Sequence, residues 1–171
     1  MDAMNIMIKL FDEEIFGPRI QDYFRNGCLT LMDDPEGGAL TDIVRLFTDD
    51  DFQKYKVTKV KNPIVKSFWM HQMAKTGARE KQEMIPYFAA KFGAFVTNGM
   101  MRNIIGQAKS AFDFFKVMQE GKILLMNLAK GETGEINSKL LGLIAVSKLQ
   151  MAALKRQKVE KSERRDFFLY I

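Results

Sequence analysis

The chain has 171 residues, of which 47% are hydrophobic and 27% are charged. This composition is typical of a folded globular protein and excludes extended disorder, and the length suits one ordinary core or two small ones. The formal net charge of +5 permits contact with nucleic acid without establishing it. The sequence has no apolar run long enough to span a bilayer, no signal-peptide pattern and a single cysteine, so we expect a cytoplasmic chain without a membrane segment.

Residues 1–98 have the patterns of helices throughout. Gly17-Pro18 ends one helix and starts another, which should run to about Met32 before the turn-forming residues 33–38. We therefore expect an all-helical domain over residues 1–98.

Cap signals mark the starts of three further helices in this domain. Thr41 can cap a short helix, and the polar run 48–51 can cap the next because carboxylates oppose the positive end of a helix dipole. The acidic triplet in this run lacks the glycine and distal glutamate of a calcium loop, so we interpret it as a cap. Asn62-Pro63 is the third start signal.

Four single residues of the helical domain allow separate predictions. Trp69 should anchor the core, and His71, which has no ligand-like neighbours in sequence, should be structural. Cys28 should be a buried thiol. Pro86 should kink or break the helix expected over residues 78–96.

The last third of the chain predicts a strand, a turn, a helix and a second strand. The runs 122–128 and 165–171 are apolar enough for strands covered on both faces, and the helix over 135–157 can return the chain for parallel pairing. We expect residues 99–171 to form a partial α/β segment. The predicted fold class is therefore mainly α, a helical bundle followed by a β-α-β piece of a parallel sheet.

The turn after the first predicted strand is a candidate ligand neighbourhood. Ligands of open parallel sheets lie beyond the carboxyl ends of the strands. Asn127 and Lys130 would lie there, and Gly131 and Gly134 would allow close approach of the backbone. The adjacent glutamates would repel a phosphate, so a plain strand-to-helix connection remains the alternative.

Catalytic chemistry is missing from the sequence. Residues 106–110 resemble only the end of a phosphate loop, without the second glycine or the preceding strand. No nucleophile–base set, paired carboxylates or metal-ligand spacing can be assembled. We therefore assign no catalytic residue and no metal site within the chain.

Basic residues gather in two places, and the default interpretation of each is a solvated face. The second group is diluted by acidic residues, whereas the first is purer and is the better candidate for a phosphate backbone. The first group contains Lys54, Lys56, Lys59, Lys61 and Lys66, and the second contains Lys155, Arg156, Lys158, Lys161, Arg164 and Arg165.

Several stretches, in their order and spacing, resemble the conjugative coupling ATPases of type IV secretion and plasmid transfer, which are related to the HerA and FtsK translocases. The resemblance covers nearly the whole chain. It rests on Gly17-Pro-Arg19, Asn62-Pro-Ile-Val-Lys-Ser-Phe-Trp69, Arg102-Asn-Ile-Ile-Gly-Gln107, Ser110-Ala-Phe-Asp-Phe114, Met118 to Gly131, Gly134-Glu-Ile-Asn-Ser138 and Arg164 to Ile171.

This resemblance implies a RecA-like motor with an inserted all-α domain, in which six subunits form a ring that pumps DNA with ATP and Mg²⁺. The partners would be DNA or a DNA-bound transfer protein and the neighbouring subunits. The resemblance places the Walker B strand at Phe167, Phe168, Leu169, Tyr170 and Ile171. The phosphate-loop lysine would then precede residue 1, and the acids that bind magnesium and catalyse hydrolysis would follow Ile171. Arg102 is a candidate for the arginine that acts on a neighbouring subunit, with a structural ion pair as the alternative.

Two other hypotheses remain. The chain could be a helical adaptor that binds a protein or nucleic acid without catalysis, or a structural segment with no separable activity. The apolar run 167–171 speaks against the adaptor, which gains nothing by ending on such a strand. In the structural segment, this run would leave an unpaired strand edge that favours self-association.

Overall fold

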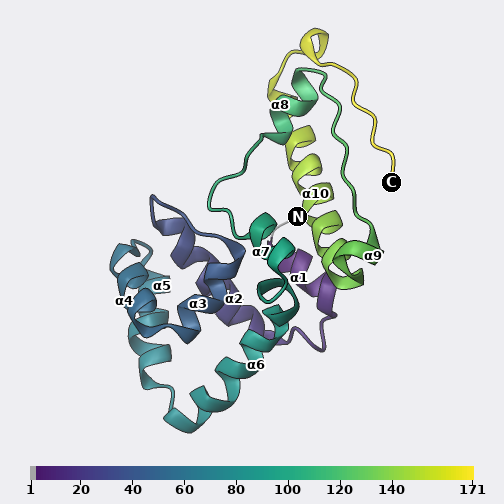
Figure 1. Ribbon diagram of the computed structural model, residues 1–171. Coiled ribbons are helices and arrows are strands. Elements are labelled where there is room, and N and C mark those ends of the chain that lie inside the picture. Colours follow the sequence, from purple (N-terminus) through teal and green to yellow (C-terminus); the bar gives the residue numbers. More distant parts are fainter. Residues whose placement is uncertain (1–2) are drawn as a thin grey trace. The chain divides into compact units, whose positions relative to one another are not determined.

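The computed structural model describes residues 3–171 and divides into two compact units (Figure 1). Residues 13–109 form the first, here called the helical unit. Residues 110–171 and the N-terminal residues up to 12 form the second, here called the terminal unit. All regular structure in the described part is helical, which confirms a mainly α protein. Within residues 3–171, no helix is both long and apolar enough to cross a membrane.

The helical unit is built around α3, which contacts α2, α4, α6 and α7. A π-helical stretch, Phe68–Met73, continues directly from α5. The helices are α2 (Pro18–Asp33), α3 (Leu40–Thr48), α4 (Asp50–Lys59), α5 (Pro63–Ser67), α6 (Ala78–Val96) and α7 (Gly99–Ile105).

Aromatic side chains form the core of this unit. Tyr23 of α2 stacks on Phe47 of α3 with ring centroids 5.2 Å apart, and Phe88 of α6 meets Phe47 edge-on at 4.9 Å. Trp69 is 5% exposed and packs on Phe47, so the prediction of a core anchor is confirmed. Its indole N–H donates to Thr30 Oγ1 at 2.8 Å, which satisfies the buried polar end of the ring.

The cap predictions are confirmed at two helices and wrong at one. The Asp49 carboxylate accepts from Phe52 N, and the Asn62 side chain accepts from Ile64 N. Thr41, by contrast, lies inside α3. Asp42 takes the capping role from within the first turn, because its Oδ2 accepts the backbone N–H of Ala39 at 2.8 Å.

Three other local predictions have mixed outcomes. The helix α6 runs through Pro86 without a break, so a kink is the remaining form of that prediction, since proline costs a helix one hydrogen bond and a steric clash without having to end it. Cys28 is only partly buried, so the prediction of a buried thiol is not met in full. His71 is exposed, and its structural role stays a prediction.

The terminal unit is organised along α10, which contacts α1, α8 and α9. The pieces are α1 (Ala3–Phe11), α8 (Phe114–Gln119), α9 (Lys130–Thr133), α10 (Glu135–Lys155) and two 3₁₀ turns, Arg156–Lys158 and Lys161–Glu163. Met118, Leu149 and Ala152 form a small buried cluster where α8 meets α10, and Phe114, Phe115 and Phe167 pack against it.

The two segments predicted as strands are extended but unpaired within residues 3–171 (Figure 1). A β-strand requires ladder hydrogen bonds to a neighbour, and no such ladder joins residues 122–128 or 165–171 to another segment of the described chain. The backbone bond from Lys122 N to Val117 O belongs to the turn that ends α8. Most apolar side chains of the two segments are exposed, with Ile123, Leu125 and Tyr170 between 88% and 90% exposed, whereas Leu124, Leu128 and Phe167 are partly buried. The β-α-β piece is therefore not shown.

Candidate functional site

A lysine face on the helical unit is the strongest candidate interaction surface. Lys54 and Lys59 belong to α4, and Lys61 and Lys66 follow in the link to α5 and in α5 itself. All four are exposed. Every charged residue from 52 to 79 is basic. Lys54 Nζ lies 3.8 Å from Asp51 Oδ1, just before this stretch, whereas Lys59, Lys61 and Lys66 make no ion pair with a carboxylate of residues 3–171.

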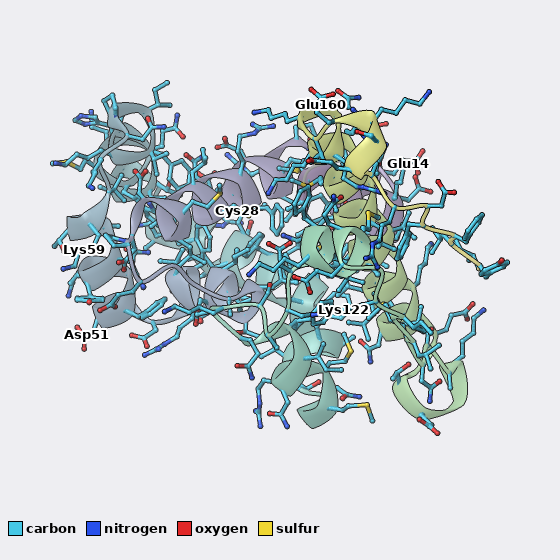
Figure 2. The ribbon with its side chains drawn as sticks, turned by 90° about the horizontal axis from the view of Figure 1, so that it is seen from above. Glu14, Cys28, Asp51, Lys59, Lys122 and Glu160 are labelled. Atoms are coloured by element: carbon cyan, nitrogen blue, oxygen red, sulfur yellow. The ribbon has the colours of Figure 1, made fainter. Side chains whose placement is uncertain are left out.

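The sequence of α4 separates its charges along the helix. Asp49 caps the N-terminus, and Asp50 and Asp51 occupy the first turn, whereas the last turn contains lysines. This order matches the helix dipole, which favours anions at the N-terminus and cations at the C-terminus. Asp51 and Lys59, both labelled in Figure 2, therefore lie at opposite ends of α4.

Lys56 is set apart from the other four lysines because it is buried. Its Nζ lies 2.7 Å from Asp34 Oδ2 and 3.0 Å from the carbonyl oxygen of Gly37. The hydrogen bond from Lys56 holds the pKa of Asp34 below its ordinary value, with help from the backbone N–H of Glu36. Lys56 thus ties α4 to the end of α2, and its ammonium does not face solvent in this structure.

Aromatic rings lie among the cations of this surface, a feature that the sequence analysis missed. The Arg45 guanidinium lies over the Phe52 ring, 4.1 Å from its centroid, and Lys59 Nζ is 5.3 Å from the centroid of Tyr55. Tyr55 is 46% exposed. Exposed aromatics beside cations suit stacking on bases. Tyr55 and Lys59 are four residues apart on a helix, so the sequence alone could have predicted that they lie side by side. Arg45, by contrast, reaches this surface only through the packing of α3 on α4.

The candidate residues near α9 form a self-contained turn. Asn127 Oδ1 accepts the backbone N–H of Ala129 at 3.0 Å, and Lys130 Nζ lies 3.5 Å from Glu135 Oε1. Gly134 adopts φ +85°, where a side chain would be strained, whereas open space surrounds the Cα of Gly131. These contacts are those of an ordinary connection, and the glycine requirement falls on Gly134 alone.

The remaining candidates lie on exposed parts of the chain. Arg102 is exposed on α7 and makes no ion pair with any carboxylate of residues 3–171. In the C-terminal segment, Phe167 packs against the cluster beneath α8. Phe168, Leu169, Tyr170 and Ile171 are at least half exposed.

The described residues offer no evident metal centre. No group of three or more histidine, cysteine, aspartate or glutamate side chains lies close enough together to hold an ion in residues 3–171. Comparison of the chain with protein-family models, curated proteins and solved structures found no match.

Proposed function

We propose that this chain is part of an ATP-driven DNA-translocating motor of the conjugative coupling type, with the helical unit contacting DNA or a DNA-bound transfer protein. The observation that carries the proposal is the exposed lysine face of Lys54, Lys59, Lys61 and Lys66, which lies in a stretch whose charged residues are all basic. Ammonium groups on such a face neutralise backbone phosphates and release counterions, which gives sequence-independent affinity suited to a translocase.

The terminal unit has a different role in this proposal. The segments 122–128 and 165–171 have strand composition and expose most of their apolar side chains, as expected of strands whose sheet neighbours lie outside these 171 residues. The pair would contribute a β-α-β piece to a RecA-like sheet, with 167–171 as the Walker B strand. ATP and Mg²⁺ would bind to groups outside this chain, next to the turn at Asn127 and Lys130.

The proposed motor also implies an assembly of subunits and a cellular location. The parent protein would work in the cytoplasm as a ring of six subunits, and Arg102 would face the nucleotide of a neighbouring subunit. Its exposure and lack of a carboxylate partner among the described residues are compatible with that role.

Salt-dependent binding to duplex DNA tests the lysine face. The variant Lys54→Glu, Lys59→Glu, Lys61→Glu should bind at least tenfold more weakly than the native chain at low salt, with a shallower dependence of log Kd on log salt. The matched control changes three other exposed lysines, Lys75, Lys109 and Lys139, to glutamate and so has the same net charge.

Equal losses in the two triple variants would reduce the effect to net charge and remove the assignment of the face. Unchanged affinity in the first variant would do the same. Circular dichroism of each variant separates a loss of binding from a loss of folding, because all regular structure in the described residues is helical.

A non-catalytic helical adaptor is the second candidate. The wholly helical regular structure of residues 3–171 favours it. Sequencing the source DNA on both sides of these codons discriminates the two. A glycine-rich Lys-Ser/Thr loop upstream and Asp-Glu after Ile171 would support the motor, whereas a ribosome site before Met1 and a stop codon after Ile171 would support the adaptor.

A further inference from the structure

Four lysines are among the residues that line a groove in the terminal unit. It has a volume of about 680 Å³ and lies between the segment 110–116 and the C-terminal half of α10. Its charged lining residues are Asp113, Lys116, Lys122, Lys148 and Lys155.

The packing of α8 on α10 brings these lysines together. Lys148 and Lys155 are two helical turns apart on one face of α10, about 10 Å along its axis, with Met151 between them. Lys116 comes from α8, which is held against α10 by the buried contact of Met118 with Leu149. The backbones of Lys116, Lys148 and Lys155 are therefore positioned by packed helices, whereas Lys122 comes from the segment after α8.

The charge in the groove is largely uncompensated. Lys116, Lys148 and Lys155 have no carboxylate within ion-pair distance in the described chain, whereas Lys122 Nζ lies 2.6 Å from Glu120 Oε2. Four lysines and one aspartate give the lining a formal charge of +3. Ammonium groups converging on a hollow raise the local positive potential and attract anions.

The single carboxylate of the lining is already engaged. Asp113 Oδ1 accepts the backbone N–H of Phe115 at 2.8 Å, as the cap of α8. At the same end of the groove, the ring of Phe112 is 46% exposed and lies 4.9 Å from that of Phe114, measured between centroids. The lining of the groove thus combines lysine side chains with an exposed aromatic ring.

We propose that this groove binds an oligophosphate anion, a molecule with two or more linked phosphate groups. Lysines spread over about 10 Å match several linked phosphates better than one, because each ammonium can then meet its own phosphate oxygens. The source can be an inorganic oligophosphate or the phosphate chain of a nucleotide whose base meets Phe112. The inference involves the terminal unit alone and does not depend on the lysine face of the helical unit.

Isothermal titration of the full chain with sodium tripolyphosphate at low salt tests the proposal. The variant Lys148→Gln, Lys155→Gln should raise Kd at least tenfold. The control Lys9→Gln, Lys139→Gln removes two exposed lysines of the same unit outside the groove and should leave Kd within twofold of native. Glutamine removes the charge but stays polar and favours helices about as well as lysine, and both target residues are exposed, so the variants should fold.

Further arms distinguish the source of the phosphates. ATP binding more tightly than tripolyphosphate, with the excess lost in Phe112→Ala, assigns the groove to a nucleotide, and equal affinities assign it to the oligophosphate itself. A single-stranded oligonucleotide is the competing ligand of the groove: if it binds more tightly than ATP and tripolyphosphate, and its binding is lost in Lys148→Gln, Lys155→Gln, the proposal is overturned in favour of nucleic acid.

Three other results would also overturn it: no measurable binding by the native chain, equal loss in the control, or orthophosphate binding as tightly as tripolyphosphate. The triple variant at Lys54, Lys59 and Lys61 should retain native tripolyphosphate affinity. Failure of the groove and failure of the proposed DNA face are therefore separable.

Discussion

Lys56 Nζ lies 2.7 Å from Asp34 Oδ2, and their side chains are 7% and 1% exposed. This ion pair joins the middle of α4 to the residue that follows α2, 22 positions earlier in the chain. Both charged groups are removed from water, so the attraction between them has to offset the hydration that each has lost. The pair anchors α4, the helix that contains Lys54 and Lys59 of the candidate face.

Replacing Lys56 should destabilise the helical unit. Lys56→Ala leaves the Asp34 carboxylate buried without its cation, which is costly, so Tm should fall by about 5 °C or more. Lys59→Ala, an exposed neighbour on the same helix, should change Tm by much less. Thermal unfolding followed by circular dichroism measures both, and equal effects would contradict a special role for the buried pair.

Stability should fall in acid because of Asp34. Its folded-state pKa is held below the ordinary value of 3.8, first by the hydrogen bond from Lys56. A lowered pKa contributes stability that is fully present above the ordinary value and is lost as the pH falls through the folded pKa. Urea unfolding at a series of pH values from 7 to 2 should show this loss, and Asp34→Asn should flatten it. Asp50→Asn, which removes an exposed carboxylate, is the control.

The hydrogen bond between Trp69 and Thr30 gives a third test. Thr30→Val keeps the shape of a fully buried side chain but removes the acceptor of the indole N–H, at a cost of about 1–3 kcal/mol in the free energy of unfolding. Because the chain has one tryptophan, its fluorescence reports on this site during urea unfolding. Thr48→Val, at an exposed hydroxyl on α3, is the matched control. A loss no larger than in the control would show that the bond contributes little.

The helices could largely be predicted because their signals are local. Asn62 and Asp49 cap helices through side chains that reach N–H groups two or three residues away. Thr41 failed because two local caps compete at that turn and Asp42 prevails. The strands could not be verified in the same way, since a strand needs a partner that no local pattern supplies.

The candidate sites likewise could be predicted only where their signals are local. The lysine face was visible as a run of basic residues, but nothing in the sequence separated Lys56 from its neighbours, because its burial depends on Asp34 and Gly37. The oligophosphate groove was not visible at all, since Lys116 and Lys148 meet only through the packing of α8 on α10.

The isolated chain should not hydrolyse ATP. Its sequence has no complete phosphate loop, and residues 106–110 reproduce only the end of that motif. Phosphate release should therefore remain at background under saturating ATP and Mg²⁺. Lys148→Gln, Lys155→Gln is the control for contamination, because activity that follows the protein peak and falls in this variant would contradict the prediction.

The exposed apolar segments should drive self-association of the chain. Leu125 is 89% exposed and Tyr170 is 90% exposed, and both lie in segments without regular secondary structure whose composition is that of strands. Sedimentation velocity should show a weight-average mass that rises with concentration, and Leu125→Asp with Tyr170→Asp should abolish the rise. Met32→Asp with Ile64→Asp places the same charges at exposed apolar positions in the helical unit and should leave the rise intact. If the two double variants behave alike, the association is non-specific. If only the variant Leu125→Asp with Tyr170→Asp stays monomeric, the two segments behave as unpaired strand edges. The proposed motor requires such edges, because other strands would complete its sheet.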